Sequence, residues 1–393
     1  MILKKLPLFF AGCAIFTLSS CIQGEPLNAE CDIVDVDSVW IKNNKSILIG
    51  TPIITNNTVS FSIQKGTDRT NLNPSFYLTP GAELTMQKSG ITVEANGAPR
   101  DFSSPQIYTT YSEDGNWSKE YTVSFNYPQP ITTCRFEHYE LDQSKRYHVW
   151  YEIDKEDQAN PRRDYWASGN AGYALTGMGK EPVNYPTVST PQGYKGNGVK
   201  LETCSTGSFG ESVNMPIAAG NLFIGEFKAG QAMIWPRKAT RFGLQLVGGK
   251  PLFLSGYYKY TAGKVFTDKD GNVDNSRKDT CDIYAVIYEV DPAKFEPLNG
   301  DDVLSSKRIV SMARIDNPGE PQEWKRFVEP FRPMNNKSFE EERLRNDGYA
   351  IAIVATSSRQ GAYFEGAIGS ILYIDELKVT WEGDEIEKNS IDF

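Results

Sequence analysis

The stretch ILYIDELKVTW, residues 371–381, decides the fold class, because apolar and polar residues alternate along its second half. Leu377, Val379 and Trp381 fall on one face of an extended chain, and the polar residues between them fall on the other. This period of two is typical of a β-strand that buries one face. Two other apolar runs have the length of buried strands, 283–290 and 350–355. The sequence therefore predicts an all-β protein.

The composition of the 393 residues fits that class and excludes several others. Aromatic residues make up 12%, and 33 Gly and 22 Pro favour many turns. With 39% hydrophobic and 23% charged residues the chain is neither disordered nor collagen-like. A net charge of −9 repels phosphate backbones, so we expect no nucleic-acid binding. The two histidines, His138 and His148, are too few for most multi-histidine metal sites.

The chain divides into two strand-rich regions. Short alternating runs recur from residue 32 to 127, and the last two flank an Asp-Gly turn at 113–116. Their number and spacing predict an immunoglobulin-like sandwich over 32–130. The Tyr-Pro-Gln-Pro stretch at 127–130 breaks the pattern, since proline cannot donate to a β-ladder. Residues 131–393 show no second proline-rich break and predict one larger β-jelly-roll sandwich, with loops such as 166–200.

The N-terminus has the features of an export signal. Lys4 and Lys5 precede an apolar run at 6–18 that is too short to span a bilayer. The sequence Leu-Ser-Ser-Cys that ends at Cys21 resembles a bacterial lipobox. We expect a signal peptide at 1–20, a lipid on Cys21 and a tether at 21–31, which would anchor the protein, as a lipoprotein, to the outer membrane. The alternative is an ordinary signal peptide with an incidental cysteine.

Four cysteines remain after these two segments: Cys31, Cys134, Cys204 and Cys281. A disulfide is allowed outside the inner membrane, and a pair of Cys31 with Cys134 would join the two ends of the first domain. The alternative is that these residues are small buried hydrophobic side chains. Since no C-x-x-C motif occurs, zinc and redox motifs are absent.

Sequence phrases in both regions resemble known modules. The first region resembles the immunoglobulin-like modules that open many surface lipoproteins of glycan-using Gram-negative gut bacteria, through residues 80–82, 101–105 with Tyr108, 113–115 and 121–123. The second resembles the "putative carbohydrate metabolism domain" family, a galactose-binding-like jelly roll, through residues 166–170, 219–223, 256–260, 282–286, 366–370 and 374–377. The resemblance implies a role in glycan handling, with a poly- or oligosaccharide and other surface glycan-utilisation proteins as partners. It carries over no catalytic motif.

One run of carboxylates fits glycoside hydrolysis. The sequence EIDKE at 152–156 resembles the E-I-D-x-E signature of jelly-roll endoglucanases. Glu152, Asp154 and Glu156 would share one face of a strand, and two carboxyls about 5 Å apart give retaining hydrolysis. However, Lys155 stands where the core-facing residue of that signature should be apolar. A solvated strand end is therefore the favoured interpretation.

Two places could hold calcium. Residues 267–274 alternate oxygen-bearing side chains, but Gly271 precedes Asn272 instead of following the third ligand as in an EF-hand. A hairpin turn at Asp270 and Gly271 is the simpler interpretation. Similarity to carbohydrate-binding modules implies a structural calcium held by Glu137 and Asp375, from the first and last strands of the jelly roll. The alternative there is two surface carboxylates. The sequence indicates no other cofactor.

Sugar binding requires flat aromatic faces together with hydrogen-bonding groups. The predicted ligand-binding residues are Trp166, Asn170, Trp235, Arg241, Tyr257, Tyr258, Tyr260 and Arg359. Alternation places Tyr258 and Tyr260 on one face of their strand and Tyr257 on the other, and one of these faces must be core. The sequence does not decide which.

These observations favour a lipid-anchored accessory protein of carbohydrate metabolism that binds or processes glycans. In this interpretation the first domain is a spacer and the jelly roll is the working part, for which carbohydrate binding without catalysis is favoured over hydrolysis. The first alternative is a glycoside hydrolase or lyase that uses carboxylates in a groove. The second is a structural or adhesive surface lipoprotein.

Overall fold

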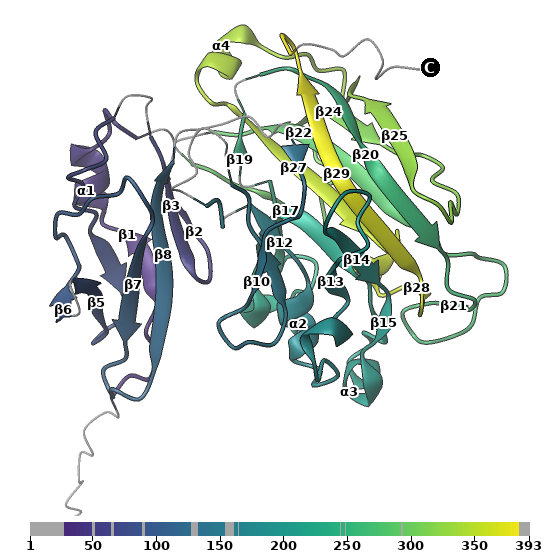
Figure 1. The fold of residues 1–393 in the computed structure, drawn as a ribbon, viewed down its shortest axis with the longest axis horizontal. Helices are drawn as coiled ribbons and strands as arrows, with labels where there is room; N and C mark the ends of the chain where they lie inside the picture. The colour runs from purple at the N-terminus through teal and green to yellow at the C-terminus, as the bar shows by residue number, and fades with distance from the viewer. Residues whose placement is uncertain are drawn as a thin grey trace, which may run out of the picture.

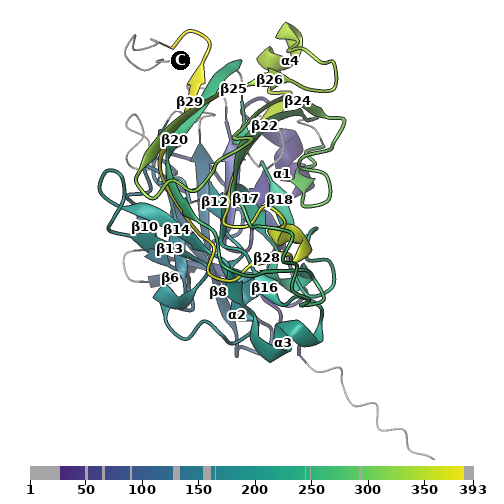
Figure 2. The same cartoon turned by 90° about the vertical axis from the view of Figure 1, so that its right-hand side faces the viewer.

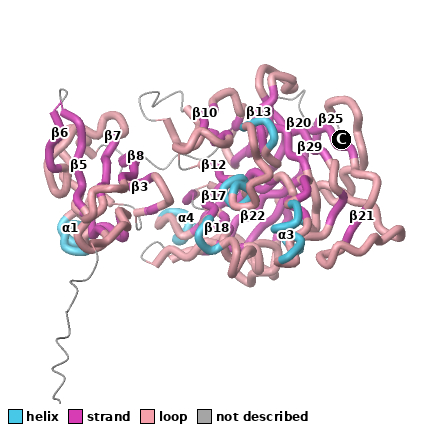
Figure 3. Tube along the Cα trace, turned by 90° about the horizontal axis from the view of Figure 1, so that it is seen from below, coloured by secondary structure: helices cyan, strands magenta, loops and turns pink. Residues whose placement is uncertain are grey.

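The computed structural model describes residues 27–48, 52–63, 67–88, 91–126, 133–153, 161–163, 165–243, 245–247, 249–291 and 294–384. The strands up to residue 126 form one body and those from residue 133 another, and the two bodies lie side by side (Figures 1 and 3). Cys21 and the boundary predicted at 127–130 lie outside the described residues. In the described part the helices are short and none is long and apolar enough to cross a membrane. The predicted all-β class is confirmed.

The N-terminal body is a sandwich around an aromatic core. Its larger sheet runs in the order β2 (Ile53–Ile54), β3 (Thr58–Ser62), β8 (Ser118–Asn126), β7 (Gln106–Tyr111), β5 (Glu83–Lys88) and β6 (Ile91–Glu94). β1 (Ile33–Val36) pairs with β4 (Phe76–Leu78), and α1 (Ser38–Asn43) follows β1. Phe61 and Phe125 stack with ring centroids 4.2 Å apart, and Trp40 meets Phe61 edge to face at 5.3 Å. Such aromatic pairs add stability beyond the area they bury.

The second body is a sandwich of two sheets. The first, here called the β22 sheet, has the order β23 (Leu298–Asn299), β18 (Thr240–Phe242), β17 (Asn221–Phe227), β27 (Tyr349–Thr356), β22 (Asp282–Glu289), β24 (Ile309–Arg314) and β26 (Arg332–Pro333), with β12 (Trp166–Ala167) on β17 and β19 (Gln245–Leu246) on β27. The second, the β29 sheet, has the order β13 (Thr187–Thr190), β14 (Gly198–Glu202), β29 (Ile371–Trp381), β20 (Pro251–Thr261) and β25 (Lys325–Pro330), with β9 (Thr133–Cys134) on β29. Figure 2 shows the two layers face to face.

Short elements complete the second body. The remaining strand pairs are β10 (Tyr139–Leu141) with β11 (His148–Trp150), β15 (Cys204–Ser205) with β16 (Ile217–Ala218), and β21 (Phe266–Thr267) with β28 (Gly366–Ala367). The helices are α2 (Asn170–Ala174), α3 (Gly207–Ser212), α4 (Glu341–Arg345) and the 3₁₀ turns η1 (Pro182–Asn184), η2 (Ala229–Gln231) and η3 (Gly361–Tyr363). The prediction of loops at 166–200 is therefore wrong, because β12, α2, η1 and β13 lie there.

Burial along the strands separates the two sheets. β22 and β27 are buried on both faces, since one face meets the β29 sheet and the other is covered by loops. In β29 and β20 buried residues alternate with partly exposed ones, so only the inner face is core. Leu377, Val379 and Trp381 lie in the shared core, as the alternation predicts.

The four cysteines in the described part of the chain, Cys31, Cys134, Cys204 and Cys281, are all free thiols. The pairing predicted for Cys31 and Cys134 is therefore wrong. Cys134 lies in the core between the two jelly-roll sheets, and burial raises its pKa well above the usual value. The alternative interpretation, small buried hydrophobic residues, describes Cys31, Cys134 and Cys281.

Candidate functional site

A cavity of about 350 Å³ lies on the outer face of the β22 sheet. Its floor is made by two rows of side chains that cross the sheet. The first row is apolar: the register aligns Phe223 of β17 with Val354 of β27, and Val354 with Tyr284 of β22. These three residues belong to the cluster on the face away from the β29 sheet.

The second row is polar and lies two residues further along the same strands. Here Asn221 of β17 is aligned with Thr356 of β27, and Thr356 with Asp282 of β22. Because side chains two apart on a strand share a face, the polar row must border the apolar one. The floor therefore combines a flat hydrophobic strip with hydroxyl, amide and carboxylate groups.

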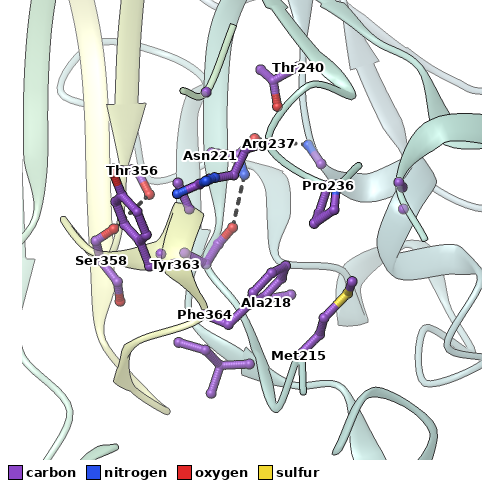
Figure 4. A pocket seen from close by; sticks show the side chains of 18 of the residues that line it. Met215, Ala218, Asn221, Pro236, Arg237, Thr240, Thr356, Ser358, Tyr363 and Phe364 are labelled. Carbon is purple, nitrogen blue, oxygen red and sulfur yellow. Dashed lines mark hydrogen bonds between the residues drawn. The ribbon is translucent and has the colours of Figure 1, made fainter. Parts of the chain in front are cut away.

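Loops and short helices form the walls. They supply Phe209, Met215, Pro236, Tyr363 and Phe364. In Figure 4 Arg237 extends from one wall towards Tyr363 on the other. The Arg237 guanidinium lies 4.8 Å from the Tyr363 ring centroid, and its Nε forms an ion pair with Asp301 Oδ1 at 2.8 Å. The ring and guanidinium thus meet across the mouth, and 47% of Tyr363 remains exposed.

A buried carboxylate holds the wall that carries Tyr363. Asp279 Oδ2 accepts hydrogen bonds from Ser358 Oγ at 2.5 Å, from Ser370 Oγ at 2.7 Å and from the Ala367 backbone N–H at 2.8 Å. Burial raises the pKa of Asp279, and these hydrogen bonds oppose that shift. The anchors lie on both sides of Tyr363 in the chain. They therefore fix the segment from both ends.

The polar row includes an ion pair. Asp282 is 2% exposed, and its two oxygens accept from Arg314 Nε at 2.9 Å and Nη2 at 2.6 Å. Arg359 lies 3.7 Å from the same carboxylate and donates to the backbone oxygens of Ile315 and Asp316. Bidentate pairing holds a carboxylate firmly as an acceptor. Asp282 is thus a fixed, negatively charged acceptor in the cavity lining, with Arg359 beside it.

Of the predicted ligand-binding residues, Arg359 lines this cavity. Trp235 is 59% exposed and directly precedes the lining residues Pro236 and Arg237. Arg241 instead donates to Glu226 at 2.6 Å across the β17–β18 pair. Tyr257 lies on the outer face of the β29 sheet, on the other side of the sandwich.

Trp166 was expected to stack on a sugar, and this prediction is wrong. Trp166 is 6% exposed, pairs with Ile224 in the sheet and packs on Phe136 with ring centroids 5.2 Å apart. Its Nε1 donates to Glu152 at 2.8 Å. Trp166 is therefore a core residue that a ligand does not reach.

Three more predicted contacts are structural. Tyr258 and Tyr260 are each 1% exposed, and their hydroxyls donate to Pro318 O at 2.6 Å and to Ser357 O at 3.2 Å. Asn170 is fully buried and exchanges two hydrogen bonds with the backbone of Thr187. The face of β20 that carries Tyr258 and Tyr260 is the core face.

Glu152 is the one proposed catalytic carboxylate that lies within the described residues. Glu152 is not among the lining residues, and Asp154 and Glu156 lie outside the described residues. Burial raises the pKa of Glu152 to about 7, while the hydrogen bond from Trp166 and the charge of Arg135 oppose the shift. In the described part of the chain the Trp166 indole is thus the side-chain hydrogen-bond donor to this carboxylate.

The predicted calcium ligands come together under one loop. Asp375 Oδ2 accepts from the Lys195 N–H at 2.8 Å, and Glu137 Oε2 accepts from the Asn197 N–H at 3.0 Å. Within the described residues no group of three or more His, Cys, Asp or Glu side chains converges on a metal position. In the other loop Asp268 accepts from its own neighbours Asp270 and Asn272, so its oxygens are already used.

Sequence reasoning missed most of the cavity. Phe209, Arg237, Asp282 and Tyr363 are far apart in the chain, and only the pairing of β17, β27 and β22 brings their segments together. One local signal was present. The run Gln-Gly-Ala-Tyr-Phe at 360–364 places aromatic residues beside glycine between two strand patterns.

The chain resembles known proteins over nearly all of the described part. Residues 135–380 match the family model described as "Putative carbohydrate metabolism domain", and residues 42–125 match "SGBP, N-terminal". A crystallised "putative glycoside hydrolase" of Bacteroides thetaiotaomicron is 41% identical, with a TM-score of 0.79, over 92% of this chain and 100% of that one. Another from Bacteroides vulgatus is 38% identical, with a TM-score of 0.58, over 64% of this chain and 98% of that one. No curated protein matches the chain.

Proposed function

The chain belongs to the putative carbohydrate metabolism domain family, and from this premise we propose that it is a glycan-binding accessory protein whose cavity on the β22 sheet holds the sugar. The match of its first domain to the N-terminal module of surface glycan-binding proteins supports the same role. The function of the protein is then to bind a glycan and hold it.

The observation that carries this proposal is the pairing of an apolar row with a polar row on the cavity floor. A sugar ring has a C–H face that gains by leaving water against a flat apolar surface, and hydroxyl groups that need fixed donors and acceptors. The flat apolar surface is provided by Phe223, Val354 and Tyr284. The fixed donors and acceptors are provided by Asn221 and Asp282. A cavity of about 350 Å³ fits the end of an oligosaccharide better than the middle of a long polysaccharide.

A glycan array with the mature chain tests this proposal. We expect retention of at least one glycan, and Tyr363→Ala should weaken its binding about tenfold, since one stacked ring contributes on the order of 1 kcal/mol. Trp117→Ala is the matched control, because Trp117 is 62% exposed in the other domain. Retention of no glycan would favour the structural or adhesive alternative. If the Tyr363 and Trp117 variants retained the glycan equally well, the cavity would not be the site that holds it.

We further propose that the protein is a lipoprotein held at the cell surface by a lipid on Cys21, on the outer membrane. The lipobox-like sequence and the surface glycan-binding module support this location. Cys21→Ser should release the protein from the membrane fraction. If the variant stays in that fraction after a high-salt wash, another anchor holds it.

A second candidate function is glycoside hydrolysis, favoured by the crystallised relatives described as glycoside hydrolases and by two carboxylates in the cavity lining, Asp282 and Asp301. Each forms an ion pair with an arginine, Asp282 with Arg314 and Asp301 with Arg237. Hydrolysis would be established if the protein released reducing ends from a retained glycan and if Asp282→Asn and Asp301→Asn abolished that release. Retention without release supports binding alone.

We also propose a structural calcium ion between Glu137 and Asp375. The residues fit such an ion: in the described part neither carboxylate has a cationic partner, and a Cβ on Gly196 would lie 2.1 Å from Glu137 Oε1, so the loop closes tightly over the pair. A bound Ca²⁺ would neutralise this buried negative charge. Added Ca²⁺ should raise the Tm of the wild type and leave that of Glu137→Gln unchanged. An equal effect on both proteins would place the ion elsewhere.

A further inference from the structure

The outer face of the β29 sheet carries a second cluster of aromatic residues, on the opposite side of the sandwich from the cavity. It consists of Tyr194, Tyr257, Trp324 and Tyr373 with Lys259 among them, and is here called the outer platform. Tyr194 is 47% exposed, and the other four are partly exposed. None of them lines the cavity.

The platform residues are held in a fixed arrangement. The rings of Tyr194 and Tyr257 stack with centroids 3.6 Å apart and planes 9° apart. Trp324 stands edge-on to Tyr194 at 6.3 Å and to Tyr373 at 6.5 Å. The ammonium of Lys259 lies 4.8 Å from the ring centroids of both Trp324 and Tyr373. Cation–π attraction therefore keeps this charge at the centre of the cluster.

The strand register builds this cluster. Tyr257 and Lys259 are two residues apart on β20, so both face outwards, and Lys259 is aligned with Tyr373 of the neighbouring β29. Tyr194 comes from the loop between β13 and β14. That loop is fastened by the hydrogen bonds of the Lys195 and Asn197 N–H groups to Asp375 and Glu137. Its position is thus set by the sheet below it.

The charge of the platform differs from that of the whole chain. The chain carries −9, yet Lys259 forms no ion pair with a carboxylate within the residues that the structure describes. Exposed basic residues lie on neighbouring segments: Lys195 in the Tyr194 loop, and Lys325 and Arg326 at the start of β25, the strand that pairs with β20. Lys200, beside Tyr373 on β14, pairs with Glu202 at 2.5 Å. The site therefore offers a cation framed by aromatic faces.

We propose that the outer platform is a second carbohydrate site, which binds a polysaccharide bearing carboxylates, such as a chain of uronic acid residues. Sugar rings stack on the exposed face of Tyr194 and on Trp324, and a sugar carboxylate pairs with Lys259. An open sheet face lets a long chain pass across it, unlike the cavity. The site is independent of the function proposed for the cavity.

The chemistry of the platform favours such a polysaccharide over other partners. A protein interface of standard size buries about 800 Å² per partner, with aromatic residues packed in a core depleted of charge, whereas here a lysine stands among the rings. Single-stranded nucleic acid also stacks on aromatic rings, but the net charge of −9 opposes its phosphates over the rest of the surface.

Affinity electrophoresis of the mature chain in gels with polygalacturonate or with a neutral galactan tests the proposal. Polygalacturonate should retard the wild type and neutral galactan should not. Lys259→Gln should weaken that binding about tenfold and remove most of its salt dependence. Tyr194→Ala should weaken it by a similar factor, and Tyr363→Ala in the cavity should leave it unchanged. Melting curves verify that each variant is folded, and Tyr194→Phe, which keeps the stacked ring, should restore binding.

Three outcomes overturn the proposal. The first is equal retardation by the neutral and the acidic polymer. The second is binding of polygalacturonate that survives both Lys259→Gln and Tyr194→Ala. The third is displacement of polygalacturonate by oligouridylate at lower concentration than by oligogalacturonate. If Tyr363→Ala lost the binding of polygalacturonate while Lys259→Gln and Tyr194→Ala kept it, the polygalacturonate would bind in the cavity instead.

Discussion

The two outer faces of the jelly roll differ in what covers them. The outer face of the β22 sheet is roofed by loops, so β22 and β27 are buried on both sides and a cavity remains between sheet and roof. Within the described residues the outer face of the β29 sheet is partly exposed, because buried and partly exposed side chains alternate along β29. One sandwich thus presents an enclosed site with a carboxylate in its floor and an open site with a cation at its centre. The covering loops, and not the sheets, account for this difference between the two faces.

The largest effect that we expect separates aromatic residues of the core from those of the faces. Trp166→Ala should lower the free energy of unfolding by about 4 kcal/mol, because it empties a buried site and leaves Glu152 without its donor. Trp235→Ala, at a position that is 59% exposed, should change it by less than about 0.5 kcal/mol. Urea denaturation measures both. If Trp166→Ala lowered the free energy of unfolding only slightly and weakened glycan binding, Trp166 would be a ligand-binding residue after all.

The next effect concerns the wall of the cavity that carries Tyr363. Asp279→Ala should cost about 3 kcal/mol, because three buried donors lose their acceptor, and should also weaken any ligand of the cavity. Asp279→Asn, which keeps one acceptor oxygen, should cost less. Binding at the outer platform should not change in either variant. If platform binding fell as well, the two faces would not be independent.

The sequence predicted the alternation in β29 correctly because that pattern is local. It could not decide which face of β20 is core, since this depends on contact with a distant sheet: Tyr258 and Tyr260 share one core cluster with residues of β22 and β27, such as Ile283 and Ile353. Trp166 was assigned to a loop because glycine and asparagine follow it, yet it pairs with Ile224, 58 residues later. The cavity was missed for the same reason, because long-range pairing assembles it.

A pH titration of stability tests the buried carboxylate at Trp166. The folded state raises the pKa of Glu152 from 4.5 to about 7, so it holds this proton more tightly than the unfolded state does. The contribution of Glu152 to stability is therefore greatest below about pH 4.5 and is lost as the pH rises towards 7. Across that range the wild type should lose on the order of 2 kcal/mol relative to Glu152→Gln. Parallel curves for the two proteins would show that Glu152 titrates normally.

The smallest expected effect distinguishes the two sites by salt. Raising NaCl from 50 to 500 mM should weaken polygalacturonate binding at the outer platform severalfold, because an exposed ammonium is screened. A glycan in the cavity should respond by less than about twofold, since stacking and hydrogen bonds hold it there. Equal salt dependence at both sites would contradict the assignment of Lys259 to the acidic chain.

The decisive experiment for the cavity is a crystal structure of the mature protein with an oligosaccharide that the array retains. We expect a sugar ring in the cavity, against Phe223 and Tyr284 on the floor and beside Tyr363 at the mouth, with hydroxyl groups bound to Asn221 and Asp282. A sugar found only outside the cavity, with the residues around Tyr363 free of ligand, would contradict the claim that this site on the β22 sheet holds the glycan.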